Sequence, residues 1–153
     1  MNLEDQVCSL EYAKKLKELG VKQESYFYYY PNSFNKEGYY IVCDDTRNIE
    51  INDKFISAFT VAELGEMLPD EFKWKYSKYQ YLMIYRKKYD GKYIIRLIHS
   101  HDCGMGTRDD LITEFSGKKE ADVLAIFLIY LIENQMYPFK VFINCDKKGL
   151  GHM

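Results

Sequence analysis

Three residues that can bind a metal occupy alternate positions in the chain, namely His99, His101 and Cys103. Alternate side chains of an extended segment point to the same side, so these three would face one way. Neutral imidazole and thiolate are both ligands of Zn²⁺. A fourth protein ligand is not obvious, because Asp102 points the other way in an extended segment, and Cys43, Cys145 and His152 are distant in the sequence. We therefore assign no metal and expect no cofactor, and we keep these three residues as weak candidates for metal ligands.

The same residues contain a nucleophile and a base. A Cys103 thiolate activated by His101 or His99 would also need an oxyanion hole and a third, orienting group. The sequence supplies neither beside them. We assign no catalytic residue and expect a non-enzymatic protein, with a small metal- or nucleotide-dependent enzyme that uses residues 99–108 as the alternative.

A glycine-containing segment follows directly, Gly104-Met-Gly-Thr-Arg108. Backbone N–H groups of such a loop can approach an anion, above all where a helix begins just after it. Thr107 and Arg108 could also contact phosphate. The segment lacks the spacing and the lysine of a P-loop. It is the best small-molecule site in the sequence, with Gly104, Gly106, Thr107 and Arg108 as ligand-binding residues; the alternative is a plain turn between a strand and a helix.

Tyrosine is the unusual feature of the composition, with 15 Tyr and 9 Phe but 1 Trp. The simplest explanation is a tyrosine-rich sheet face covered by a helix. Tyrosines beside arginine can also stack on nucleotides or form the centre of a protein interface. The residues of this predicted tyrosine surface are Tyr26, Tyr28, Tyr30, Tyr79, Tyr81, Tyr85, Arg86 and Arg96. We add Tyr81, Tyr85 and Arg96 to the predicted ligand-binding residues.

Three helices are expected to position these residues. Apolar spacing predicts the first over 4–19, ended by Gly20 in a Schellman motif. Thr60 and Glu63 predict a capping box for a helix over 60–68, with a hydrophobic staple between the residues at positions 59 and 64. The longest helix, over 118–135, is apolar almost all the way round, which indicates a central core helix or packing in a homo-oligomer.

Two hairpins are expected beside the helices, with strands at 26–30 and 39–43 and at 79–89 and 92–99. Asp90-Gly91 predicts a two-residue turn in the second hairpin. That turn would pair Leu82 with His99, Ile84 with Leu97 and Tyr85 with Arg96, and would place Leu82, Ile84, Ile95 and Leu97 on the core side. We expect a loop over 101–108, a short helix over 109–115 and a last strand over 139–145.

The fold expected from these elements is α+β, with one antiparallel sheet of about four strands and two to three helices. The order is α-β-β-α-β-β-α, in a single domain over residues 1–153. A formal net charge of −2 argues against broad nucleic-acid binding, although a basic segment over 73–92 leaves a local site open. The longest apolar run, Val123–Ile132, is shorter than the roughly 20 residues of a membrane span. Together with the lack of a signal peptide, this predicts a cytoplasmic protein without membrane contact.

Three blocks of the sequence stand out, namely Gln6-Val-Cys-Ser-Leu-Glu with Ala13-Lys-Lys-Leu-Lys-Glu-Leu-Gly-Val-Lys-Gln-Glu-Ser25, Phe59-Thr-Val-Ala-Glu-Leu-Gly-Glu-Met-Leu-Pro69, and Glu120-Ala-Asp with Leu128-Ile-Tyr-Leu-Ile-Glu-Asn134. Together these blocks are similar to a family of small, uncharacterised phage and prophage proteins. The resemblance implies a phage accessory protein in the bacterial cytoplasm. It would act by binding a host protein or a nucleotide-type small molecule, and inhibition of a bacterial defence system is one form this could take. A self-assembling structural protein is the third alternative.

Overall fold

The computed structural model describes residues 2–32, 38–43, 53–68, 71–73, 80–87 and 90–136. For residues 71–73, 80–87 and Asp102 only the backbone is described. The predicted strand over 139–145 lies outside the described residues.

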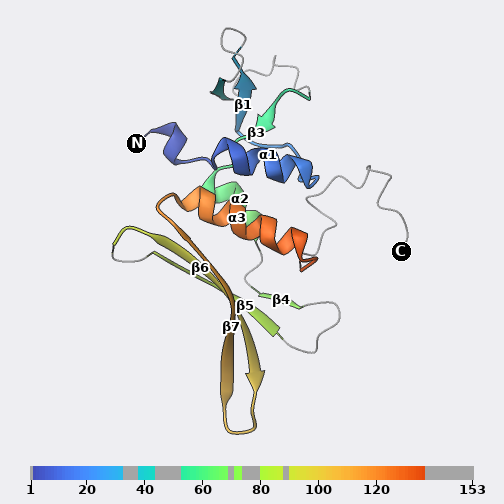
Figure 1. The fold of residues 1–153 in the computed structure, drawn as a ribbon, viewed down its shortest axis with the longest axis vertical. Coiled ribbons are helices and arrows are strands. Elements are labelled where there is room, and N and C mark those ends of the chain that lie inside the picture. Colours follow the sequence, from blue (N-terminus) through green and yellow to red (C-terminus); the bar gives the residue numbers. More distant parts are fainter. Residues whose placement is uncertain are drawn as a thin grey trace, which may run out of the picture.

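The fold is α+β, as predicted, but its strands form two antiparallel sheets (Figure 1). The small sheet has the order β2-β1-β3, with β1 at Phe27–Pro31, β2 at Tyr39–Cys43 and β3 at Ile56–Ser57. The large sheet has the order β4-β5-β6-β7, with β4 at Glu71–Lys73, β5 at Gln80–Lys87, β6 at Tyr93–Asp102 and β7 at Thr107–Gly117. The helices are the short 3₁₀ turn η1 at Leu3–Asp5, α1 at Leu10–Glu18, α2 at Val61–Met67 and α3 at Glu120–Glu133. The two predicted hairpins are both present, one in each sheet.

Helix α3 lies at the centre of the molecule. It contacts α1 and α2 on one side and β6 and β7 of the large sheet on the other (Figure 1). Its buried side chains are Ala121, Val123, Leu124, Ala125, Phe127, Leu128, Ile129, Leu131 and Ile132. This double packing explains why the helix is apolar almost all round, and the prediction of a central core helix is confirmed. None of the described helices is long and apolar enough to cross a membrane.

The C-terminal end of α1 and the N-terminal cap of α2 are as predicted. Gly20 adopts φ 86° and donates to the carbonyl of Lys17, while Val21 donates to the carbonyl of Leu16, which is the Schellman pattern. The capping box of α2 is complete, with Thr60 Oγ1 accepting from the backbone of Glu63. The predicted start of α1 at residue 4 is wrong. The helix begins at Leu10, because the preceding residues form η1 and an extended segment.

The register between β5 and β6 differs by one residue from the prediction. Leu82 pairs with Ile98 and Lys87 with Tyr93, so the connection spans residues 88–92 instead of a two-residue turn. Asp90 Oδ1 accepts a hydrogen bond from the backbone of Lys92 inside this longer loop. A shift of one residue exchanges the faces of a strand. The predicted pairs of Leu82, Ile84 and Tyr85 are therefore wrong.

Two residues of the predicted core side are confirmed on β6. Ile95 and Leu97 are completely buried. Their register partners on β5 are Tyr85 and Met83, so Leu97 does not pair with Ile84 as predicted. The side chains of β5 lie outside the described part of the structure.

The largest correction concerns residues 101–115. The predicted loop over 101–108 is reduced to a turn at 103–106, and the predicted helix over 109–115 is absent, because β6 continues to Asp102 and residues 107–117 form β7. Asp109 and Asp110 resemble the cap of a helix in the sequence. Both instead lie within the strand, and their carboxylates pair with side chains of the hairpin, Asp109 with Ser100 and Asp110 with Arg108.

Candidate functional site

The far end of the β6–β7 hairpin extends away from the helices (Figure 1). We call residues 98–112 the hairpin arm. Its turn is closed by a hydrogen bond from Cys103 N to the carbonyl of Gly106, 2.9 Å long. Gly104 and Gly106 have φ angles of 76° and 136°, which favour glycine, and the side chain of Met105 between them is fully exposed.

This turn removes the structural argument for the predicted phosphate site at Gly104, Gly106, Thr107 and Arg108. The site was expected at the N-terminus of a helix, where backbone N–H groups and the helix dipole attract anions. A strand follows instead. The glycines therefore serve the turn geometry, and Thr107 and Arg108 are exposed residues at the start of β7.

Two histidines and an aspartate meet on the arm. His99 is the register partner of Asp110, and His101 is the register partner of Arg108. The imidazole rings of His99 and His101 stack with their centroids 5.2 Å apart and an interplanar angle of 28°. One possible ligand atom from each of His99, His101 and Asp110 lies within 4.8 Å of the other two. We call these three residues the His–Asp cluster.

The cluster differs from the predicted metal candidates by one residue. His99 and His101 come together as expected, but Cys103 is exposed at the turn, with its Sγ 4.0 Å from the carbonyl oxygen of His101. Asp110 takes its place. Its Oδ2 lies 3.7 Å from His101 Nδ1, and its Oδ1 accepts a hydrogen bond from Arg108 Nε at 3.2 Å. The signal that could have identified Asp110 is the turn at 103–106, which sets it opposite His99.

Among the other charged side chains that the structure describes on the hairpin, Arg96, Glu114 and Asp109 each have a partner on the opposite strand. Arg96 on β6 donates to Glu114 on β7, and Ser100 Oγ donates to Asp109 Oδ1 at 2.6 Å. Arg96 and Arg108 were both predicted to bind a ligand. Each has its Nε in a hydrogen bond to a carboxylate, so neither guanidinium carries an uncompensated charge.

The apolar side chains of the arm are exposed instead. The register shifts between Leu97 and Ile98, which pair with Thr113 and Leu111, so Ile112 is the extra residue of a β-bulge. Leu111 and Ile112 are 58% and 44% exposed. Among the described residues, five large hydrophobic side chains are exposed, and three of them are on the arm: Met105, Leu111 and Ile112. β7 is also an edge strand of the described large sheet.

The predicted tyrosine surface is divided between the two sheets. Tyr28 is buried in the small sheet, Tyr30 packs against Phe55 at 4.7 Å between ring centroids, and Tyr26 is exposed. Tyr81, Tyr85 and Arg86 belong to β5, so their side chains lie outside what the structure describes, as does the whole of Tyr79. The structure therefore does not bring these tyrosines together on one described face.

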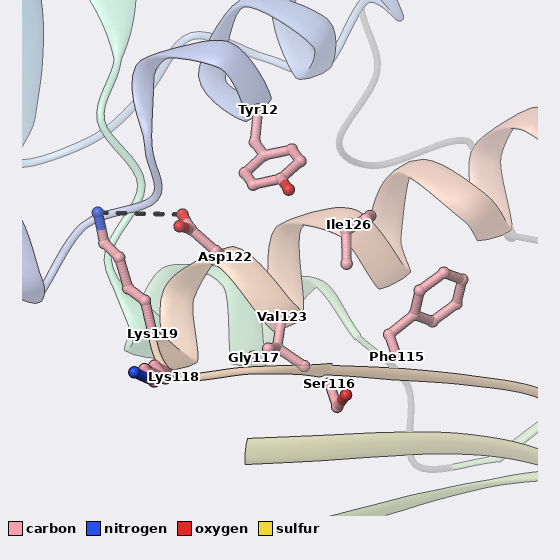
Figure 2. Close-up of a pocket in the computed structure, with 9 residues that line it drawn as sticks. All are labelled: Tyr12, Phe115, Ser116, Gly117, Lys118, Lys119, Asp122, Val123 and Ile126. Carbon is pink, nitrogen blue, oxygen red and sulfur yellow. Dashed lines mark ion pairs between the residues drawn. The ribbon is translucent and has the colours of Figure 1, made fainter. Parts of the chain in front are cut away.

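A pocket of about 320 Å³ lies between α1, the end of β7 and the start of α3 (Figure 2). Tyr12 and Ile126 line it together with residues 115–119. Burial raises the pKa of the Tyr12 hydroxyl. Asp122 and Lys119 stand together at one end of the pocket and are joined by an ion pair of 3.9 Å (Figure 2).

The polar groups of this pocket serve the contact between the helices. Asp122 accepts two hydrogen bonds from Ser9, and Lys119 Nζ donates to Ser9 Oγ at 3.3 Å. Hydrogen bonds that are already made within the protein leave little for a ligand. None of the residues that line this pocket was a predicted site residue, because they come together only when α1, β7 and α3 pack.

Burial makes the Cys8 thiol unreactive. Cys8 is completely buried, and this burial raises the pKa of its thiol from 9.0 to about 12. A thiol in this state is a poor nucleophile, because the thiolate is the reactive form. Tyr29 donates its hydroxyl to the backbone carbonyl of Cys8 at 2.7 Å, and burial also raises the pKa of this tyrosine.

Comparison of this chain with protein-family models, with curated proteins and with solved structures finds no match.

Proposed function

We propose that the protein works by binding a partner protein through the hairpin arm, without catalysing a reaction. The observation that carries the proposal is the exposure of Leu111 and Ile112 at a bulge on an edge strand. The arginines and carboxylates whose side chains the structure describes there are paired within the hairpin, so the apolar side chains are what the described part of the arm offers to a partner.

Burial of these two side chains would make a measurable contribution to the binding free energy. Complete burial of a leucine or isoleucine side chain contributes about 1.5–3 kcal/mol. Leu111 and Ile112 have about half of their surface still to bury, so together they would supply roughly 2 kcal/mol. That free energy corresponds to a change of about thirtyfold in Kd.

The arm is also suited to binding by its shape. Cross-strand pairs such as Arg96–Glu114 and Ser100–Asp109 favour one conformation of the hairpin before the partner arrives. A preformed element loses less conformational entropy on binding than a flexible loop does. The apolar residues stand on the strand itself, where their positions are set by the register.

The setting of this proposal comes from the resemblance to phage and prophage proteins. We propose a phage accessory protein whose partner is a protein of the bacterial host, with an apolar recess that receives the bulge. A component of a host defence system is one such partner. A nucleotide-type ligand finds less support, because Arg96 and Arg108 are engaged by carboxylates.

The test uses a variant of the bulge and a matched control. Leu111→Thr/Ile112→Thr removes apolar surface and keeps residues that favour strands. Tyr26→Thr removes an exposed aromatic side chain, 72% exposed, from the other sheet. Immobilised wild-type protein would be used to isolate a partner from bacterial lysate, and the purified partner would then be titrated against all three proteins.

We expect the wild type and Tyr26→Thr to bind alike, and the double variant to bind at least tenfold more weakly. Equal binding of the partner by the double variant would contradict the role of the arm. A doubled mass of the wild type in solution, lost in the double variant, would show that a second copy of the chain occupies the arm and would replace the host partner.

A further inference from the structure

We propose that the His–Asp cluster binds a divalent transition-metal ion of the Zn²⁺ type. The site is separate from the proposed protein contact at Leu111 and Ile112, and it does not depend on that function. Both strands of the arm contribute ligands, since His99 and His101 lie on β6 and Asp110 lies on β7.

The distances between the ligand atoms are close to those of a metal site. Zn²⁺ binds nitrogen and oxygen at about 2.0–2.2 Å, so two ligand atoms of a tetrahedral site are separated by about 3.3–3.5 Å. His101 Nδ1 and Asp110 Oδ2 lie 3.7 Å apart. The possible ligand atoms of His99, His101 and Asp110 all lie within 4.8 Å of one another. Any two of these atoms would have to approach by at most about 1.3–1.5 Å to reach the coordination distances.

The nitrogen of His101 is placed for coordination. His101 Nδ1 is withdrawn from solvent and makes no hydrogen bond to the described part of the chain. The carboxylate oxygen Oδ2 of Asp110, which carries negative charge, lies 3.7 Å from this nitrogen. A buried polar atom without a hydrogen bond is costly, and an ion between these two atoms would satisfy both.

A fourth residue orients the carboxylate. Arg108 Nε donates to Asp110 Oδ1, which leaves Oδ2 on the side of His101. Hydrogen bonds of this kind to a ligating carboxylate hold its orientation and affect metal affinity. Arg108 is therefore a positioning residue of the site, and its guanidinium has no direct contact with the ion.

The donor set selects the class of ion. Two imidazoles and one carboxylate suit Zn²⁺, Co²⁺, Ni²⁺ or Cu²⁺, whereas Mg²⁺ and Ca²⁺ prefer sites made of oxygen atoms. Three protein ligands leave one tetrahedral position to water, since Asp110 is partly exposed to solvent.

The experiment measures metal binding to the intact chain. Zn²⁺ is titrated by calorimetry after treatment with a chelator, and Co²⁺ is added separately, since its visible absorption reports the ligand set. We expect one equivalent of Zn²⁺ per chain and a visible Co²⁺ band. His101→Ala and Asp110→Asn should each weaken binding at least tenfold, and Asp110→Asn retains the shape of the side chain should His101→Ala fold poorly.

Three control variants keep the site intact. Cys103→Ser removes the nearest thiol, Asp109→Asn alters the neighbouring carboxylate that is bonded to Ser100, and His152→Gln removes the histidine outside the described residues. The Kd of each variant for Zn²⁺ should lie within about twofold of the wild-type value. Removal of a ligand or of its supporting residue would weaken the affinity 10-fold or more. Less than one fifth of an equivalent of bound Zn²⁺ would overturn the proposal. So would undiminished binding by both His101→Ala and Asp110→Asn, or a loss in Cys103→Ser as large as in these two variants.

Discussion

Ser9 donates both its backbone N–H and its hydroxyl to the carboxylate of Asp122, each at 2.6 Å, across 113 positions of the chain. Ser9 precedes α1 and Asp122 is in the first turn of α3. The carboxylate therefore lies beside the N-terminal ends of two helices, where the helix dipoles favour a negative charge. The Ser9 hydroxyl makes no capping bond to its own helix and is used for this contact with α3 instead.

We expect Asp122→Ala to lower the free energy of unfolding by about 2 kcal/mol, because it leaves two donors of Ser9 without their partner. Ser9→Ala should cost about 1 kcal/mol, and the two changes should be non-additive by 0.5 kcal/mol or more, since they remove the same contact. Urea denaturation of the single and double variants measures all three values.

A second link between the same helices provides the control. Lys15 and Glu133 form an ion pair of 3.1 Å in which both side chains are about half exposed. Exposed pairs contribute about 0–1 kcal/mol, so Glu133→Ala should have a small effect. If Glu133→Ala destabilised the protein as much as Asp122→Ala, the special role of the Ser9–Asp122 contact would be refuted.

Glu63 is expected to matter more than an ordinary capping residue. Its carboxylate accepts hydrogen bonds from Thr60 N and Thr60 Oγ1, and also from Ser25 Oγ and Tyr26 N at the start of β1. Glu63→Ala should lower the free energy of unfolding by about 2 kcal/mol or more, against about 1 kcal/mol for Thr60→Ala.

The exposed Glu66 on the same helix is the control for this experiment. Glu66→Ala should change stability by no more than about 0.5 kcal/mol. Thermal denaturation followed by circular dichroism ranks the three variants. If Thr60→Ala were less stable than Glu63→Ala, the hydrogen bonds from Ser25 and Tyr26 to Glu63 would contribute nothing to stability.

Alkaline solution should destabilise the protein through Cys8. Burial raises the pKa of this thiol from 9.0 to about 12 in the folded protein. Above pH 9.0 the unfolded chain releases this proton while the folded chain keeps it, so the stability falls as the pH rises. The expected slope from this one group is about 1.4 kcal/mol per pH unit.

The change Cys8→Ala should remove this slope between pH 9.0 and pH 10.0, whatever its effect at neutral pH. Tyr29, whose pKa is also raised by burial, adds its own loss of stability above pH 10.0. The free energy of unfolding measured at several pH values gives both slopes. An unchanged slope in Cys8→Ala would show that another group is responsible.

The thiols should differ in reactivity with a disulfide reagent. Cys43 and Cys103 are exposed, and Cys8 is completely buried. In a Cys145→Ser variant, which removes the cysteine outside the described residues, we expect two fast reactions in the folded protein. The third should appear only with denaturant, because the buried thiol is neither accessible nor ionised. Three fast reactions would contradict the burial of Cys8.

The predictable elements are those whose sequence motifs lie within a few residues of the start or end of the element. Thr60 and Glu63 specify the start of α2 locally, and Gly20 specifies the end of α1 in the same way. The apolar run of α3 was long enough to identify the helix and its central place.

The elements that were missed depend on partners far along the chain. Asp109 and Asp110 are unfavourable in a strand by propensity, and only their cross-strand partners on β6 explain their place in β7. The five-residue connection over 88–92 contains a dipeptide typical of a two-residue turn, which led to the wrong register. The His–Asp cluster follows from the β6–β7 pairing, and so Asp110 was missed together with the strand.

Because α3 lies at the centre of the fold, the core can form only after this helix has been synthesised. The α1–α2 layer and the large sheet both pack on this one helix, which occupies residues 120–133. A chain growing on the ribosome at about 5–20 residues per second would expose the apolar faces of the α1–α2 layer and of the large sheet before α3 has been synthesised. We therefore expect the protein to acquire its native core in one late, cooperative step, with folding slowed by the long loops that this step must close.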